Sequence, residues 1–190
     1  MKLLILLPFS LLFLGCNSGS ENKLSDNPVD STVTPGPAKD TTVPAPPTGK
    51  IDIESFGPVR LGQHYLETIK ALGQPENKSK AVEWGADGLM HEDWTLTSKG
   101  LVLNMSSEKE NSAATLTVFS ITATAPCTFK TAAGIGIGST YEELLAAYPR
   151  DINKEESTRE QVTVGSIYGG IIFSLRDHKV IRIFLGAAAE

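Results

Sequence analysis

The sequence predicts an α+β domain built on an antiparallel sheet with few helices. Apolar and polar residues alternate along several short segments between residues 100 and 185, the pattern of half-buried strands. Apolar residues at helical spacing occur near residues 65–72 and 141–148. Long runs of strands with one helix in each half favour an α+β fold over a parallel sheet.

The first sixteen residues predict where the protein is located in the cell. A basic start at Lys2, an apolar run and the small residue Gly15 are typical of a secretory signal peptide. The run is shorter than the roughly 20 residues that a membrane-spanning helix needs. We therefore expect residues 1–15 to be a signal peptide that is removed.

A cysteine directly after Gly15 resembles the lipobox of bacterial lipoproteins, although Phe13 stands where leucine is usual. The resemblance implies that Cys16 becomes the lipidated first residue and that its acyl chains hold the protein on the membrane of the cell envelope. By resemblance to the sorting of enterobacterial lipoproteins, Asn17 rather than Asp after the cysteine implies the outer membrane. The alternative is an ordinary signal peptide that is cut elsewhere.

The next segment, up to residue 50, has the composition of a tether. Six of the protein's 11 prolines lie between residues 17 and 50, among Ser, Thr, Asn and Asp and without an aromatic residue. Such a segment buries too little apolar surface to offset the entropy lost on ordering. We expect residues 16–50 to be a disordered tether and residues 51–190 to form one globular domain.

The globular part contains a weak internal repeat. Glycine, tyrosine, glutamate and alanine recur at an offset of 76 residues, in the pairs Gly62/Gly138, Tyr65/Tyr141, Glu67/Glu143 and Ala71/Ala147. The strand patterns of 100–105 and 118–121 also return, at 170–175 and 180–183. We expect two tandem copies of a short helix plus antiparallel strands, at about 51–125 and 126–190, which together form a curved sheet.

Each copy should start with a turn into a short helix. In the first copy the helix has Tyr65, Ile69 and Leu72 on one face, a weak start at Gln63-His64 and a stop at Gly73 and Pro75. In the second copy Ser139 and Glu142 predict a capping box. Its apolar face is expected from Tyr141, Leu144, Leu145 and Tyr148, and Pro149 ends the helix.

Strands are expected after each helix. Period-two alternation predicts one buried face from Phe119, Ile121 and Ala123 and another from Ile181, Ile183 and Leu185.

The turn into a short helix carries a further resemblance. The segments Leu61-Gly62-Gln63 and Ile137-Gly138-Ser139, each before a helix that stops at a proline, are similar to the small α/β unit of BamE-type lipoproteins of outer-membrane protein assembly. Two units in tandem resemble the architecture of the β-lactamase inhibitory protein. That likeness implies a sheet that presents a concave surface to a protein partner.

Composition argues against nucleic-acid binding and against a disulfide. Without residues 1–15 the chain has 16 basic and 22 acidic residues, interspersed, so it lacks a basic patch for nucleic acid. The two cysteines are Cys16 and Cys127. If Cys16 carries lipid, Cys127 has no partner, and its apolar neighbours predict a small buried side chain.

No catalytic, metal or cofactor site is predicted. His91-Glu92-Asp93 is the densest group of possible ligands, but on a strand only His91 and Asp93 share a face, and zinc needs three or four ligands. We expect a solvated loop entering a strand there. The glycines of 134–138 follow G-x-G-x-G, which is not the nucleotide-binding fingerprint.

Aromatic residues give the best indication of a binding site. Trp84 lies in a predicted turn and Tyr168 beside a predicted strand, and such side chains are enriched at the energetic centres of protein interfaces. Trp94 alternates with Leu96 and is expected in the core. The sequence favours a non-enzymatic envelope lipoprotein that binds a protein or an envelope polymer. The alternatives are a periplasmic inhibitor or chaperone-like module and an enzyme with an unrecognised site.

Overall fold

A computed structural model describes residue 52 and residues 54–188. The expected signal peptide at 1–15, the lipidation site Cys16 and the expected tether at 16–50 lie outside the described residues.

The described part is dominated by strands. Its helical segments are α1 (Tyr65–Leu72), the 3₁₀ turn η1 (Thr97–Lys99), α2 (Ser112–Thr115) and α3 (Tyr141–Ala147). Its strands are β1 (Ser55–Phe56), β2 (Val59–Arg60), β3 (Asn77–Lys78), β4 (Val82–Glu83), β5 (Met90–Leu96), β6 (Leu101–Ser107), β7 (Thr117–Thr124), β8 (Ile152–Asn153), β9 (Gln161–Ser166), β10 (Gly169–Arg176) and β11 (Lys179–Gly186). This composition confirms the predicted mixed fold with an antiparallel sheet.

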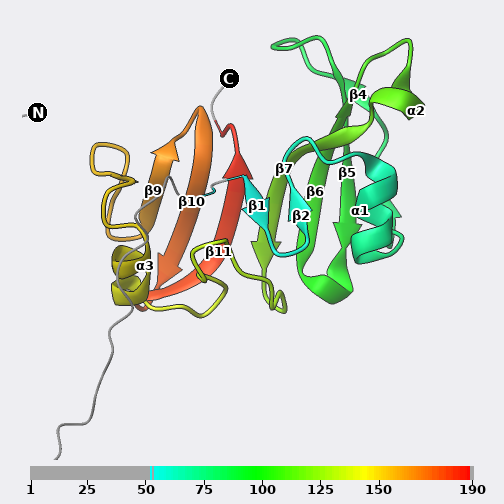
Figure 1. Cartoon of the computed structure of the whole chain (residues 1–190). Coiled ribbons are helices and arrows are strands. Elements are labelled where there is room, and N and C mark those ends of the chain that lie inside the picture. The colour runs from blue at the N-terminus through cyan, green and yellow to red at the C-terminus, as the bar shows by residue number, and fades with distance from the viewer. Residues whose placement is uncertain (1–51, 53, 189–190) are drawn as a thin grey trace, which may run out of the picture. The chain divides into compact units, whose positions relative to one another are not determined.

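Nine of these strands form one antiparallel sheet. The order is β3-β5-β6-β7-β11-β10-β9-β8, and β4 also pairs with β5. The first half of the chain thus runs from one edge to β7, and the second half runs from the other edge to β11 (Figure 1). The two halves meet where β7 pairs with β11, and the register there places Thr122 opposite Phe184.

One face of the sheet carries the core. Residues paired across neighbouring strands point to the same side, so a single row can be followed from β5 to β9. That row is fully or almost fully buried and consists of Trp94, Leu103, Ile121, Leu185, Ile171 and Val164. The expected core position of Trp94 is confirmed, because 1% of its surface is exposed.

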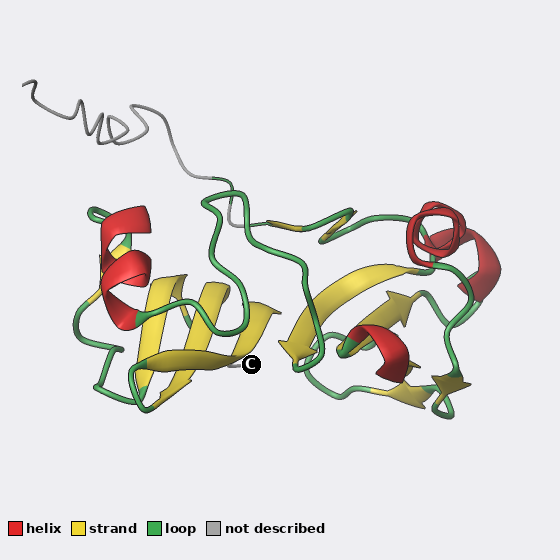
Figure 2. Ribbon diagram, turned by 90° about the horizontal axis from the view of Figure 1, so that it is seen from below, coloured by secondary structure: helices red, strands yellow, loops and turns green. Residues whose placement is uncertain are grey.

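Both long helices cover this face. The rings of Tyr65 in α1 and Trp94 are nearly perpendicular, with 6.4 Å between their centroids. The ring of Tyr148, the C-cap of α3, lies 5.7 Å from that of Phe173. The β1–β2 hairpin lies on the same side of the sheet (Figure 2) and adds the buried Phe56 to the core. Among the residues that the structure describes, the opposite face carries no helical layer.

The start of α3 differs from the expectation by one residue. The N-cap is Thr140, whose hydroxyl accepts from the amide of Glu143 while the Glu143 carboxylate accepts from the amide of Thr140. The predicted pair of Ser139 and Glu142 was wrong. The Ser139 hydroxyl instead accepts from the amide of Gly136, in the turn before the helix.

Two β-bulges also change the expected faces. In β7 the partners of Asn104 and Met105 are Ser120 and Val118, so Phe119 is an extra residue without a partner across β6. In β11 the partners of Ser174 and Leu175 are Arg182 and Val180, so Ile181 is extra in the same way. The expectation that Phe119 and Ile181 are core residues of their strands was wrong, since both are only partly covered.

The two halves share a set of backbone hydrogen bonds. The Gly62 amide donates to the Val118 carbonyl at 2.7 Å, and the Gly138 amide donates to the Val180 carbonyl at 2.8 Å. Both glycines have positive φ, at 72° and 88°, which glycine adopts without strain. Two further bonds of each half follow the same pattern, namely Val118 to Gln63 and Tyr65 to Leu116 in the first, and Val180 to Ser139 and Tyr141 to His178 in the second.

Within the part of the chain that has described coordinates, none of the helices has the length and apolar character needed to span a bilayer.

Candidate functional site: a groove on the open face of the sheet

A groove of about 680 Å³ lies on the face of the sheet that the helices leave open. It crosses the junction of the two halves, because β7 and β11 both contribute to its floor. Its lining is mostly apolar and consists of Trp84, Phe119, Ser120, Gln161, Ile167, Ile172, Arg182, Phe184, Ala187 and Ala188.

The sheet register explains why these side chains gather there. Phe184 and Ile172 are paired across β11 and β10 and point away from the core row. The bulge adds Phe119 from β7 on the same side, where its ring meets that of Trp84 at 5.8 Å. Phe119, Phe184 and Trp84 are all half-buried. The groove therefore offers aromatic surface that remains accessible to a partner.

Arg182 gives the groove one positive charge. It follows the bulge of β11, is exposed, and its guanidinium carbon lies 5.6 Å from the centroid of the Phe184 ring. Among the described residues, the ion pairs join His91 with Asp87 and Lys109 with Glu83, and neither pair involves Arg182. The guanidinium of Arg182 can therefore donate hydrogen bonds to a carboxylate of a partner.

The structure places the two predicted binding residues differently. Trp84 lines the groove, at the start of the turn that joins β4 to β5. Tyr168 lies at the tip of the β9–β10 hairpin with 72% of its surface exposed, and its neighbour Ile167 lines the groove. The Tyr168 side chain is thus beside the groove and is not part of its lining.

His91 lies directly beneath Trp84. The two rings stack with 3.7 Å between centroids and an angle of 7°, and the Phe119 ring meets His91 at 4.8 Å and 90°. The His91 side chain is 1% exposed. The expectation of a solvated loop at residues 91–93 was wrong, because His91 and Asp93 belong to β5 and His91 is enclosed.

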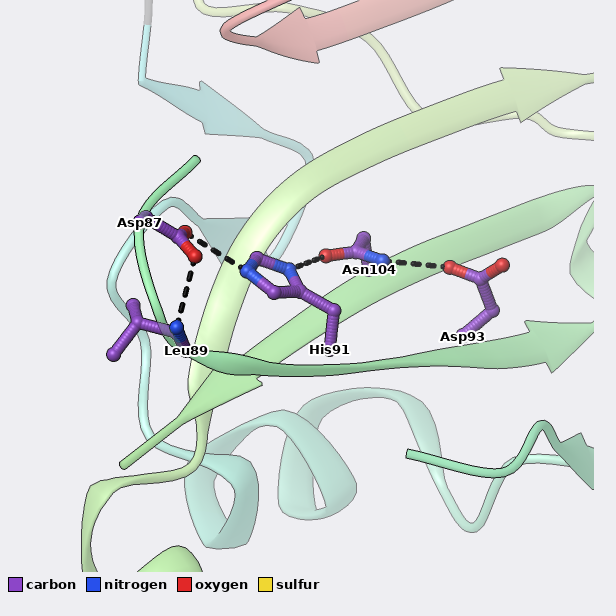
Figure 3. A network of polar contacts seen from close by, with 5 residues as sticks. All are labelled: Asp87, Leu89, His91, Asp93 and Asn104. Carbon is purple, nitrogen blue, oxygen red and sulfur yellow. Dashed lines mark hydrogen bonds and ion pairs between the residues drawn. The ribbon is translucent and has the colours of Figure 1, made fainter. Parts of the chain in front are cut away.

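A chain of polar contacts holds His91 (Figure 3). Its Nε2 lies 2.9 Å from a carboxylate oxygen of Asp87, and its Nδ1 lies 2.7 Å from the side-chain oxygen of Asn104. The Asn104 amide in turn donates to Asp93 at 2.9 Å. The other oxygen of Asp87 accepts from the amide of Leu89 at 2.9 Å. Asp87 therefore connects the turn that carries Trp84 to the sheet.

The electrostatics of this turn favour an ionised Asp87. The Leu89 amide, and after it the hydrogen bond and charge of His91, hold the pKa of the Asp87 carboxyl below its ordinary value. A carboxylate that accepts from both groups is an acceptor only, so it fixes the turn while it stays ionised.

Two residues of the core, Cys127 and Tyr148, have side chains whose pKa is raised by burial. Cys127 is buried, and burial raises the pKa of its thiol. Tyr148 is fully buried, its hydroxyl donates to Thr131 at 2.8 Å, and burial raises its pKa to about 12. Neither side chain borders the groove. In the part of the chain with described coordinates, no three His, Cys, Asp or Glu side chains come together as metal ligands.

Comparison with protein-family models, with curated proteins and with solved structures finds no match to this chain. The chemistry of the groove is therefore the basis for assigning a function.

Sequence reasoning missed most of this groove. Phe119 was expected in the core, and Arg182, Phe184 and Ile172 carried no motif. The one available signal was that the open face of the central strands bears aromatic and aliphatic residues, where a solvated face normally bears polar ones.

Proposed function

We propose that this domain is a non-enzymatic binding module that captures a segment of a protein partner in the groove on the open face of its sheet. The observation that carries the proposal is a groove at the β7–β11 junction lined by three half-buried aromatic rings, those of Trp84, Phe119 and Phe184. Aromatic side chains with a polar rim are the usual energetic centre of protein interfaces.

The groove also specifies the chemistry of the segment. Trp84, Phe119 and Phe184 offer aromatic walls, which suit an apolar or aromatic side chain of the partner. The exposed guanidinium of Arg182 beside Phe184 suits a carboxylate next to that side chain. The proposed ligand is thus a protein segment with an apolar residue adjacent to an acidic one.

We further infer that the sheet is a tandem duplication. The recurring Gly and Tyr positions, the three matched backbone bonds of each half and the bulges at Phe119 and Ile181 all support it. In the repeat, residues 118–121 correspond to residues 180–183, so Ile121 corresponds to Ile183 and Ala123 to Leu185. Ile121 pairs with Leu185 and Ala123 pairs with Ile183, which is the register expected if a two-fold axis relates β7 and β11. Duplication would place equivalent open faces side by side, and the groove crosses that junction.

We propose that the signal peptide directs the module to the cell envelope. On this proposal residues 1–15 are a lipoprotein signal peptide, Cys16 carries acyl chains in the outer membrane, and residues 17–50 hold the domain away from the lipid. Acyl labelling of the chain, and its loss in Cys16→Ser, tests this part separately from the groove.

Site-specific photo-cross-linking in cells tests the groove. A photoreactive residue at Phe184 should capture a discrete partner, whereas the same residue at Leu66, an apolar side chain of α1 that is 58% exposed, should not. The captured peptide should contain an acidic residue beside an apolar one. Capture of the same partner from both positions would contradict the proposal, because it would show contact over the helical face as well.

A further inference from the structure

We propose that His91 positions Trp84 in the groove through its proton, so that the doubly protonated ring fastens the 84–89 turn to the sheet and loss of one proton loosens it. This inference rests on the proposed function only where it concerns partner binding. The fastening itself follows from the contacts of His91.

The hydrogen-bond partners of the His91 ring determine which of its nitrogens must carry a proton. The Asp93 carboxylate can only accept, so the Asn104 amide nitrogen must face it at 2.9 Å. The Asn104 oxygen then faces Nδ1 of His91 at 2.7 Å, and the Asp87 carboxylate faces Nε2 at 2.9 Å. Both ring nitrogens face acceptors, so both must carry a proton for every contact to be a hydrogen bond.

The charged groups around the ring agree with a cation. Asp87, in the turn, contacts the ring directly. Asp93 lies on β5, the strand of His91, and contacts the ring only through Asn104 of β6. Glu83 of β4 is paired with Lys109 at 2.7 Å. From β7 the group that faces the ring is the aromatic Phe119, and Trp84 stacks on its other side. Aromatic faces and carboxylates both stabilise an imidazolium.

The two hydrogen bonds of the His91 ring differ in how easily they can break. Asn104 is held by Asp93, so Nδ1 should keep its proton when the ring becomes neutral. Nε2 would then face the Asp87 carboxylate with a lone pair. Asp87 is 29% exposed and can turn to solvent, which frees the turn that ends at Leu89 and begins at Trp84.

Nitrogen NMR of the full chain in detergent micelles tests the fastening directly. At acid pH both His91 ring nitrogens should be protonated, and at higher pH the ring should become the Nδ1–H tautomer. The indole signal of Trp84 should change with the same midpoint. A neutral ring at acid pH, an Nε2–H tautomer, or a Trp84 signal that ignores the titration would overturn the inference.

Two variants of one hairpin provide the control. In Asp87→Asn the amide can donate to an unprotonated Nε2, so the Trp84 signal should lose its dependence on the His91 titration. Glu83→Gln removes the same charge from β4 without touching His91 and should leave the coupling unchanged. Equal behaviour of the two variants would overturn the role of Asp87.

Partner capture separates this inference from the proposed function. Capture at Phe184 should fall about tenfold from acid to alkaline pH, the effect of losing one charge-assisted hydrogen bond. If the NMR titration behaves as expected and capture at Phe184 does not change with pH, the partner does not depend on the position of Trp84, but the fastening by His91 stands. If no partner is captured at Phe184 at any pH, the proposed function is wrong and the fastening still stands. If the NMR titration fails, the fastening is wrong whatever the partner does.

Discussion

Removing Trp94 should cost this domain a large part of its stability. The ring is 1% exposed in the row that crosses the sheet, and the Tyr65 ring packs against it in a T-shaped arrangement. The Lys78 ammonium lies 3.9 Å from the centroid of the Trp94 ring. Truncating a buried tryptophan to alanine costs about 3–5 kcal/mol. The lost edge contact and cation–π contact favour the upper part of that range. Domains of this size have a free energy of unfolding of about 5–15 kcal/mol.

Urea unfolding followed by circular dichroism measures this cost. For Trp94→Ala the midpoint should fall by roughly 2 M at an unchanged slope, since slopes for small domains are about 1–3 kcal/mol/M. Trp84→Ala is the matched control, because Trp84 is half-buried over His91, and it should lose only about 1 kcal/mol. A loss below about 1 kcal/mol for Trp94→Ala, or equal losses for both variants, would refute the assignment of Trp94 to the core and of Trp84 to the groove.

Three further predictions concern single side chains. Thr140→Ala removes the N-cap of α3 and should cost about 1 kcal/mol in the same urea assay, and Ser139→Ala should cost less. The pKa of Tyr148 is raised to about 12 from an ordinary value of 10.0, so stability should fall by about 2–3 kcal/mol as the pH rises between these values, and Tyr148→Phe should remove that dependence. The Cys127 thiol is buried and should react slowly with a thiol reagent in the native protein and quickly after denaturation; fast native labelling would place it at the surface.

Much of the fold follows from local patterns in the sequence. The spacing of Tyr65, Ile69 and Leu72 predicted a helix where α1 lies, and alternation predicted buried Ile121, Ile183 and Leu185. The extra residues Phe119 and Ile181 could not be predicted, because a bulge depends on how two strands pair and leaves little trace in either strand alone. The position of the α3 cap differed by one residue because Ser139 and Thr140 are both good capping residues.

Less of the groove than of the fold could be predicted from the sequence. The sequence predicted a turn at Trp84, and the structure has Trp84 in the turn between β4 and β5, where it lines the groove. The enclosure of His91 depends on Asn104 and Asp87, which approach it from another strand and from a turn. Three polar residues at these separations form no recognisable motif. The register of β5 with β6 brings Asn104 to His91, and the turn before β5 brings Asp87.

The binding of a partner by the groove is tested most directly by a matched pair of charge reversals. Arg182 of β11 lines the groove, whereas Arg176 ends β10 outside it, and both are exposed arginines on neighbouring strands. With the partner captured at Phe184 in hand, Arg182→Glu should weaken its equilibrium binding by about tenfold or more, since one charge-assisted contact becomes a repulsion. Arg176→Glu should change the affinity by no more than about twofold, as a rim charge does. Equal affinities for the two variants, or a larger loss for Arg176→Glu, would contradict the assignment of the groove as the binding surface.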